Sequence, residues 1–392
     1  GVTGSIACYK AADLASKLAQ AGAVVDTILT RAATEFIKPL TFSSLTGRRA
    51  YVDGDLWGDE AHVLHIGLAH GADLLLIAPA SAHTLAKLAQ GLAEDLLSVT
   101  ALAATCPLVI APAMDAGMYS HPATEANIEI LLQRGAHFVG PEEGHLASGL
   151  VAKGRLSEPV DILGRVRYLL TREGRLRGRK IVVTAGGTRE RIDPVRFISN
   201  RSSGKQGYAV AQAALDAGAE VVVITAARMT CPAGARCVEI DSAQEMHDAV
   251  MRETADADVL VMAAAVADFR PAEPAAHKIK KAEGVPTIAL TRNPDILLDV
   301  AREREKTGMP AVVVGFAAES QDLLQNARTK LERKGLSMIV ANDIAAADAG
   351  FAVDTNRVTV LADNGTEETL PLMSKAAVAE QLVERIANRL GA

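Results

Sequence analysis

Polar side chains suited to holding a polyphosphate gather between residues 193 and 207. The stretch reads DPVRFISNRSSGKQG and runs into an alanine-rich helical pattern. Backbone amides at the start of a helix favour an anion. Hydroxyls, amides and an ammonium group come from Ser202, Ser203, Gly204 and Lys205. The GxxxxGK[ST] pattern of a P-loop is absent, and a ligand-free cap of the helix is the alternative interpretation.

Further polar groups of the second half follow predicted strands. The turn AGGTRE, with Gly186 and Gly187, follows the strand at residues 181–184, and Asp268 follows the strand at residues 259–263. Open α/β sheets bind ligands at this end of their strands. A basic loop at residues 277–281 (HKIKK) contains Lys278. Cations there suit phosphates, although a solvated charged loop is the commoner explanation.

The first half carries a similar but smaller set of groups. Small residues with a hydroxyl open its first helical pattern and suit a mononucleotide phosphate, although a tight turn explains them equally well. These residues are Gly4, Ser5 and Ile6. Ser81 and Thr84 follow a predicted strand, and His65 precedes it. A lone histidine is more often structural than catalytic.

Aliphatic runs alternate with amphipathic helical stretches twice along the chain. This alternation predicts an α/β fold of two doubly wound, mainly parallel-sheet, Rossmann-like domains, of which we expect the first to be flavodoxin-like. In the first half we expect strands at residues 23–30, 72–79 and 107–112, and helices at 11–21 and 82–93. In the second half we expect strands at 181–184, 221–225, 259–263, 311–314 and 338–340, then an edge hairpin of 358–361 and 368–372.

Residues 170–180 (LTREGRLRGRK) interrupt the pattern, with several arginines and no buried stripe. We predict a solvated linker there, between domains at residues 1–169 and 181–392. A local anion-binding patch is the alternative. The glycine turn at the start of the chain lacks the strand that normally precedes such a turn, so we expect that a first strand is missing from the numbering.

Composition excludes several classes of protein. Apolar residues make up 49% of the 392 residues but aromatics only 3%, so the cores must be aliphatic. A net charge of −6 argues against a nucleic-acid binder. The sequence contains no apolar run long enough to span a membrane and no signal peptide, so we expect a cytoplasmic protein. Cys8, Cys106, Cys231 and Cys237 lack CxxC or zinc spacing, and we expect reduced thiols.

The second-half motifs, taken in order, resemble those of phosphopantothenate–cysteine ligases. The resemblance covers residues 178–392 and rests on TAGGTRE, DPVRFISNRSSGKQG, AAAVADFR, KIKK, NPDI, GFAAE and KG…AND. It implies an enzyme of coenzyme A biosynthesis that activates the carboxylate of 4′-phosphopantothenate with CTP. The amine of cysteine would then displace CMP from the acyl-cytidylate. Cations must neutralise the leaving group, and Mg²⁺ would be held mainly through the triphosphate.

The resemblance also implies roles for single residues. Asn200 would stabilise the acyl-cytidylate, Asp268 would contact the cytosine, and Lys278 would act at the reacting phosphate or the acyl intermediate. The implied nucleotide and acyl-cytidylate contacts are Gly186, Gly187, Ser202, Ser203, Gly204, Lys205, Asp268, Lys278, Asn293, Pro294, Asp295, Ile296, Phe316, Lys330 and Lys334. The metal ligands are left unknown.

The first half resembles the homo-oligomeric flavin-containing cysteine decarboxylases. The implied cofactor is FMN, and the implied reaction converts 4′-phosphopantothenoylcysteine to 4′-phosphopantetheine. Oxidation of the thiol to a thioaldehyde would allow loss of CO₂. His65 matches the active-site histidine of that family. The implied FMN contacts are Gly4, Ser5, Ile6, Thr30, Phe42, Ser43, Ser81 and Thr84.

Two candidate catalytic positions depart from the decarboxylase pattern. The PAMN motif reads Pro-Ala-Met-Asp here, ending at Asp115, and the ACG motif of the flap has Ser148 in place of cysteine. An ionised Asp115 would repel a substrate carboxylate, so this side chain must be protonated or point elsewhere. Ser148 has too high a pKa to replace a cysteine as proton donor.

Several functions therefore stay open. The first domain is a full decarboxylase with another proton donor, a decarboxylase that reduces poorly, or a scaffold in a ligase-only enzyme. A flavin-binding regulatory protein leaves the second half unexplained. An NAD(P) oxidoreductase lacks its GxGxxG motif. The resemblance implies trimers from the first half and dimers from the second, hence a homo-oligomer with a dodecamer as the family expectation.

Overall fold

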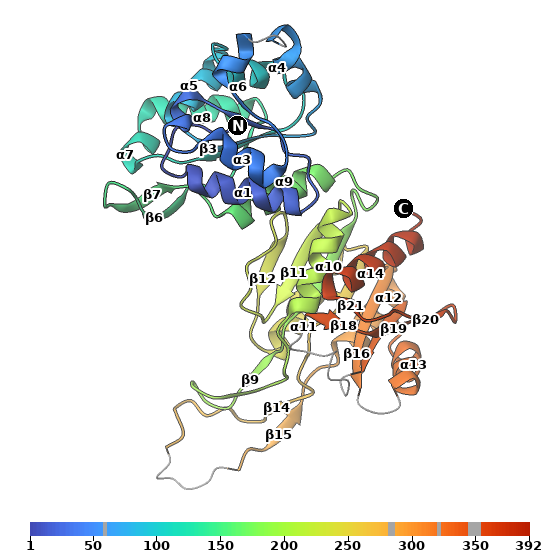
Figure 1. Ribbon diagram of the computed structural model, residues 1–392. Helices are drawn as coiled ribbons and strands as arrows, with labels where there is room; N and C mark the ends of the chain where they lie inside the picture. Colours follow the sequence, from blue (N-terminus) through green and yellow to red (C-terminus); the bar gives the residue numbers. More distant parts are fainter. Residues whose placement is uncertain (58–60, 281–286, 320–322, 344–353) are drawn as a thin grey trace. The chain divides into compact units, whose positions relative to one another are not determined.

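The computed structural model describes residues 1–57, 61–280, 287–319, 323–343 and 354–392, with the backbone only at 61–63, 318–319 and 343 (Figure 1). Its contacts divide the chain into two compact units, Gly1–Leu170 and Thr171–Ala392. Each unit is an α/β structure with mainly parallel strands, which confirms the predicted fold class.

In the first unit, short parallel strands form the centre. Strand β1 (Thr27–Leu29) pairs with β2 (Ala50–Val52), and β3 (Leu75–Ala80) pairs with β4 (Leu108–Pro112), which pairs with β5 (His137–Phe138). The first residues of the chain connect the two groups. Val2 pairs in parallel with Leu29, and Ala78 donates a backbone hydrogen bond to Gly1. The position between β1 and β3 is thus held by residues that the sequence analysis did not assign to a strand.

Helices surround these strands. They are α1 (Cys8–Gln20), α2 (Arg31–Thr34), α3 (Pro39–Thr46), α4 (Ala61–His70), α5 (Ala82–Gln90), α6 (Leu96–Ala103), α7 (Ala116–Tyr119), α8 (Pro122–Gln133) and α9 (Pro159–Thr171). An antiparallel hairpin of β6 (Glu142–His145) and β7 (Val151–Arg155) precedes α9. The predicted helix at residues 82–93 ends earlier, at Gln90, because Gly91 takes the left-handed conformation (φ +71°) that terminates many helices.

The second unit is built on one eight-stranded sheet. Its order is β12 (Arg236–Glu239), β11 (Glu220–Thr225), β8 (Lys180–Ala185), β13 (Val259–Met262), β16 (Val312–Glu319), β17 (Met338–Asp343), β19 (Val358–Ala362) and β20 (Glu367–Thr369). All pairs are parallel except those of β19, so the predicted strands and the antiparallel edge hairpin are confirmed, although the last strand ends at Thr369 and not at residue 372. The chain leaves β8 toward β11 and later returns to β13 on the other side of β8. Such a switch point is where ligands bind in open α/β sheets.

Helices cover both faces of this sheet (Figure 1). Helices α10 (Lys205–Asp216) and α14 (Lys375–Arg389) pack together on one face. Helices α11 (Ala243–Glu253), α12 (Ile296–Thr307) and α13 (Leu323–Arg333) bury aliphatic side chains against the other face. Short ribbons of β9 (Arg189–Arg191) with β10 (Phe197–Ser199), β14 (Phe269–Pro271) with β15 (Leu290–Arg292), and β18 (Thr355–Asn356) with β21 (Met373–Ser374) complete the unit.

The predicted solvated linker at residues 170–180 is corrected by the structure. Leu176 in its middle is 0% exposed, and its N–H donates to the carbonyl of Ala217 at 2.7 Å. Arg179 pairs with Asp258 at 2.8 Å. The arginine-rich composition hid one buried leucine that fixes this stretch to the second unit, although most of its other residues are exposed.

The expectation of four reduced cysteines is also wrong in part. Cys231 and Cys237 form a disulfide, because a turn at residues 232–235 brings their Cα atoms to 6.0 Å. Cys8 and Cys106 are free thiols, and burial raises the pKa of both. None of the described helices combines the length and the apolar character needed to cross a membrane.

Candidate active sites in the two units

In the first unit, Thr3 ties the start of the chain to the end of β3. Its side chain is 1% exposed. The hydroxyl donates to the carbonyl of Pro79 at 2.8 Å and accepts the N–H of Ser81 at 2.9 Å. A Cβ on the next residue, Gly4, would lie 2.6 Å from the Cβ of Ala32, so only glycine fits there. These contacts bring the predicted phosphate turn beside Ser81.

The turn offers amides to an anion. Within the described part of the chain, the N–H groups of Gly4, Ser5 and Ile6 donate no hydrogen bond, and no side chain caps α1. Successive amides with no protein acceptor at a helix start bind phosphate well. The arrangement therefore fits the phosphate of a mononucleotide such as FMN.

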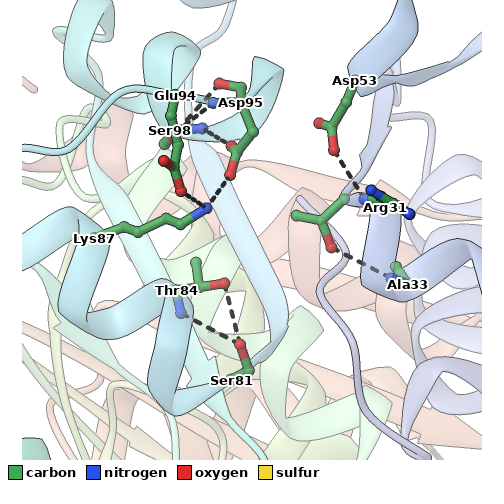
Figure 2. A network of polar contacts seen from close by, with 10 residues as sticks. Arg31, Ala33, Asp53, Ser81, Thr84, Lys87, Glu94, Asp95 and Ser98 are labelled. Atoms are coloured by element: carbon green, nitrogen blue, oxygen red, sulfur yellow. Dashed lines mark hydrogen bonds and ion pairs between the residues drawn. The ribbon is translucent and has the colours of Figure 1, made fainter.

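Ser81 and Thr84 stand on the first turn of α5 (Figure 2). The Ser81 hydroxyl accepts the N–H of Thr84 at 3.3 Å and lies 3.2 Å from the Thr84 hydroxyl. One turn further along, Lys87 reaches Glu94 and Asp95, both at 2.7 Å, and anchors the helix against α6 (Figure 2). Lys87 and Asp95 are both largely buried, which gives this ion pair a stronger positioning effect than surface pairs have.

Of the other predicted FMN contacts, Thr30 caps α2 by accepting the N–H of Ala33 at 3.3 Å. Beside it, Asp53 accepts the N–H of Arg31 at 2.9 Å, and the second carboxylate oxygen of Asp53 is buried without a partner (Figure 2). Phe42 is wholly buried in the core, and Ser43 accepts the N–H of Ala50. The structure gives these last two side chains a supporting role, and their contact with FMN stays a prediction.

His65 lies on α4, and its Nδ1 atom is buried without a hydrogen-bond partner in the described structure. A buried polar atom left unpaired costs free energy and often marks a functional position. No described contact joins His65 to Thr3 or Ser81. The described contacts thus do not link this histidine to the turn cluster, and they leave one ring nitrogen without a protein partner.

The two positions that depart from the decarboxylase pattern contact each other. The hairpin of β6 and β7 packs on the end of β4 through a bond from Met114 N–H to the carbonyl of Gly154 at 3.0 Å. At its tip, Ser148 donates to Asp115 at 2.6 Å. This bond and one from Gly117 N–H lower the pKa of Asp115. Asp115 is therefore ionised at neutral pH and points toward the hairpin.

A substitution of Thr3 tests how far its bonds to Pro79 and Ser81 support the flavin site. We expect Thr3→Val, which keeps the shape, to leave the Ser81 N–H unpaired at a cost of about 1–3 kcal/mol. The variant should lose bound flavin and melt earlier, as measured by flavin absorbance after gel filtration and by calorimetry. Thr46→Val is the control, since the described contacts of the Thr46 hydroxyl are local ones to the backbone of Phe42 and Arg48. Full flavin retention by Thr3→Val would contradict the role given to Thr3.

In the second unit, glycines let several segments converge where β8 ends. Gly186 has φ +85°, and a Cβ on it would lie 2.6 Å from the Ala227 nitrogen. A Cβ on Gly187 would lie 2.6 Å from the carbonyl oxygen of Asn200. Gly204 begins α10 with φ +81° and also packs on Ala227. The predicted AGG turn, Asn200 and the start of α10 therefore meet in one place.

The segment after β13 is the common partner of several predicted residues. Asn200 donates to the carbonyl of Val266 at 3.0 Å. Thr188 accepts the N–H of Ala267 at 3.0 Å, and Asn293 donates to the Ala267 carbonyl at 2.7 Å. The N–H of Asn293 also bonds to the carbonyl of Asp268, whose side chain is exposed. Both asparagines and Asp268 are thereby brought to the switch point.

More predicted residues lie on or beside α12, β16 and α13. Asp295 caps α12 and pairs with Lys334 at 3.1 Å. Lys330 lies one turn before Lys334, while Phe316 is half-buried in β16 and Pro294 half-buried before the helix. Ile296 is buried in the core, so its side chain serves packing.

The serine-rich loop ends in a cluster of cations. Ser203 accepts the N–H of Lys205, Ser202 is half-buried, and Lys205 pairs with Asp354 at 2.6 Å. Lys375 at the start of α14 is only 7% exposed. Burial and then the charge of Lys205 lower the pKa of Lys375. Sequence reasoning missed Lys375, because it lies 170 residues away from the loop that it supports.

Lys278 is exposed on the loop after β14. The adjoining peptide group of Ile279 is bonded to Asp193 and Arg196. Lys281, the last residue of the predicted basic loop, lies outside the described residues. Among the residues that the structure describes, no three His, Cys, Asp or Glu side chains are grouped as a metal site.

Other supporting residues were also missed by the sequence analysis. Thr188 and Asp193 stand inside motifs that it quoted and Thr3 directly precedes the predicted phosphate turn, but their burial was not visible there. A small hydroxyl beside a glycine, or a carboxylate before a proline, was the only available signal. Such side chains bond to backbone groups, and sequence alone does not say which ones.

Comparisons with known proteins match both units. Residues 1–171 match the flavoprotein family, and residues 176–390 match the family described as the DNA/pantothenate metabolism flavoprotein C-terminal domain. The fold and the two sites thus define a flavoprotein domain joined to a pantothenate-metabolism domain. The chain belongs to the family of the coenzyme A biosynthesis bifunctional protein CoaBC. It is a bifunctional enzyme of coenzyme A biosynthesis, with a ligase and a decarboxylase, as the motifs predicted.

Similarity to these relatives extends over the whole chain. The CoaBC protein of Bacillus subtilis strain 168 is 45% identical over 390 residues, covering 98% of this chain and 95% of that protein. The CoaBC protein of Mycobacterium tuberculosis strain H37Rv is 46% identical over 399 residues, with 98% and 95% covered. A crystal structure of a CoaBC C-terminal domain is 37% identical, with a TM-score of 0.47, and covers 56% of this chain and 98% of that chain.

Proposed function

We propose that the second unit joins 4′-phosphopantothenate to cysteine with CTP, and that the first unit then decarboxylates the product with FMN. The convergence of the AGG turn, Asn200 and the start of α10 at the switch point of the sheet carries the ligase half of this proposal. Lysines border that point from several elements, as a polyphosphate requires.

The ligation has two steps that the site must serve. A carboxylate oxygen of 4′-phosphopantothenate attacks the α-phosphorus of CTP, and the bond to pyrophosphate breaks. The amine of cysteine then attacks the acyl carbon, the carbon–oxygen bond to CMP breaks, and the amine loses a proton. Charge grows on the leaving phosphate in both steps, so fixed cations and amides lower the barrier.

Each group in the site has an assignment under this proposal. Amides at Gly186, Gly187 and Gly204, with Ser202, Ser203 and Lys205, would hold phosphates. Asn200 would hold the acyl-cytidylate and Lys278 the reacting phosphate or acyl group. Asp268, Asn293, Pro294, Asp295, Ile296, Phe316, Lys330 and Lys334 would surround the nucleotide. Mg²⁺ would bind mainly through the triphosphate oxygens.

In the first unit, the amides of Gly4, Ser5 and Ile6 would hold the FMN phosphate, with Thr30, Ser43, Ser81 and Thr84 along the rest of the cofactor. FMN supplies reversible transfer of an electron pair, which activates the cysteinyl group of the substrate toward loss of CO₂. His65 would hold or move a proton at its buried Nδ1 atom.

The contact of Ser148 with Asp115 affects the last step of this reaction, in which the product must receive a proton. The Ser148 hydroxyl is committed to a carboxylate and is a poor acid. A water molecule or another side chain would have to protonate the product. A decarboxylase that reduces poorly, or a flavin-binding scaffold in a ligase-only enzyme, is the second candidate that this observation favours.

Asp115→Asn tests the effect of the carboxylate on substrate binding. We expect KM for 4′-phosphopantothenoylcysteine to fall by about tenfold, because a like charge is removed from the substrate carboxylate. Since the pKa of Asp115 lies below its ordinary value, the group stays ionised at pH 5. Lowering the pH from 7 to 5 should therefore not improve KM of the wild type. A KM that is unchanged or higher in the variant contradicts this role.

The cofactor and the nucleotide can be tested separately. Flavin released from the purified protein should have the mass of FMN. Pyrophosphate release should require both CTP and 4′-phosphopantothenate, with ATP and GTP as matched nucleotides. Equal pyrophosphate release with all three nucleotides would still support a ligase but would refute the preference for CTP. Absence of release with any of them would refute the ligase.

We also propose a cytoplasmic homo-oligomer, with trimers of the first unit and dimers of the second combined in a dodecamer. Light scattering of the whole chain measures its mass. A stable monomer would contradict the proposal.

A further inference from the structure

Asp193 is a charged side chain buried outside the site residues assigned above. It lies between β9 and β10 and is 2% exposed. One carboxylate oxygen, Oδ1, accepts the N–H groups of Val195 and Arg196, both at 2.8 Å. The other, Oδ2, accepts from the guanidinium of Arg196 at 2.9 Å and from the N–H of Ile279 at 3.2 Å. The first oxygen therefore shapes its own loop, and the second reaches a distant segment.

Arg196 holds the same distant peptide from the other side. Its Nη2 atom donates to the carbonyl of Ile279 at 2.8 Å. Four residues earlier, Ala275 donates to the carbonyl of Ile192 at 2.9 Å. Both polar groups of Ile279 are thus bonded to one Asp–Arg pair, and the basic loop is fixed alongside β9 and β10.

We propose that Asp193 and Arg196 are positioning residues for Lys278, a role that rests on the function proposed above. Lys278 directly precedes Ile279, and its own side chain is exposed. A lysine ammonium on a flexible four-carbon stem loses much conformational freedom when it is held at a reacting group. Fixing the adjoining backbone removes part of that cost and keeps the ammonium within reach.

The bonds of Asp193 and Arg196 to Ile279 form a clamp, and charge stabilises this clamp in addition to its geometry. Burial alone would raise the pKa of Asp193, but the bonds from Val195, Arg196 and Ile279 outweigh it, and the pKa lies well below its ordinary value. The clamp therefore stays charged throughout the working pH range, and acidification to pH 5 should not release it.

Asp193→Asn separates the two functions of the carboxylate. An asparagine whose oxygen stays at the Oδ1 position keeps the bonds from Val195 and Arg196 N–H. Its NH₂ group then stands at the Oδ2 position and cannot accept the N–H of Ile279. The variant should keep its local loop and lose the link to the basic loop.

The experiment is a double-mutant cycle on pyrophosphate release by the whole chain, with Asp193→Asn, Lys278→Ala and both together. We expect Asp193→Asn to lower kcat by about 10–100-fold while KM for CTP changes little. The double variant should be no slower than Lys278→Ala alone, because the clamp acts through Lys278.

Asp258→Asn is the matched control. Asp258 also joins an arginine, Arg179, and a backbone N–H, that of Lys180, but at the opposite end of β8. It should change the melting temperature and leave kcat unaltered. If the kcat losses of Asp193→Asn and Lys278→Ala multiply in the double variant, the positioning role is refuted, whereas the assigned role of Lys278 stands. If Lys278→Ala by itself leaves pyrophosphate release unchanged, both this inference and the assigned role of Lys278 fall.

Discussion

Lys278→Ala is expected to slow pyrophosphate release by about 10²–10³-fold, the usual cost of removing one group that stabilises transition-state charge. Lys278 would face the phosphate or acyl group on which charge develops, and alanine leaves that charge to water. Flavin content and decarboxylation of added 4′-phosphopantothenoylcysteine should be unaffected, because Lys278 belongs to the second unit.

Lys280→Ala is the matched control for this prediction. It removes the same charge from the same exposed loop, two residues away. Stopped-flow measurement of pyrophosphate under saturating CTP separates the chemical step from binding. Equal, small effects of both variants would mean that the loop contributes only a general positive field, which weakens with salt.

His65→Asn is expected to lower CO₂ release from 4′-phosphopantothenoylcysteine by about 10²–10⁴-fold, the range for loss of a general acid or base. Asparagine keeps a polar group at the buried Nδ1 position but cannot carry the proton. Because no described contact joins His65 to the turn that would hold FMN, bound flavin should stay at the wild-type level.

His70→Asn is the control, on the exposed last turn of the same helix. CO₂ release by both variants is measured with labelled substrate, beside flavin absorbance. If His65→Asn loses flavin and CO₂ release in proportion, the histidine supports the fold of the site and not its chemistry.

The sheets and the meeting of the ligase motifs could be predicted from sequence. Buried parallel strands are continuous aliphatic runs, and residues that follow such strands must lie at one edge of the sheet. Gly186 and Asp268 were predicted together on that ground and Asn200 by the family resemblance, and the structure brings their segments together. Helix ends were less accurate, because caps such as Gly91 act through backbone conformation.

What could not be predicted depends on contacts between distant residues. Leu176 looks like part of a charged linker until Ala217 is seen to accept its N–H. The bond between Ser148 and Asp115 joins positions 33 residues apart, and nothing in either motif indicates it. Lys375 and the Asp193 clamp are similar cases. Buried polar side chains are placed by tertiary structure, and their sequence signal is a single residue.

The central claim is that one chain performs both reactions in order. The most direct measurement is mass spectrometry of the products after the purified protein is given 4′-phosphopantothenate, CTP, Mg²⁺ and cysteine, beside a Ser148→Cys variant. We predict 4′-phosphopantothenoylcysteine first and 4′-phosphopantetheine as the final product. An accumulating oxidised product that Ser148→Cys carries forward would make the first unit an impaired decarboxylase. Absence of any ligation product, with ATP as well as CTP, would show that the chain is not this ligase.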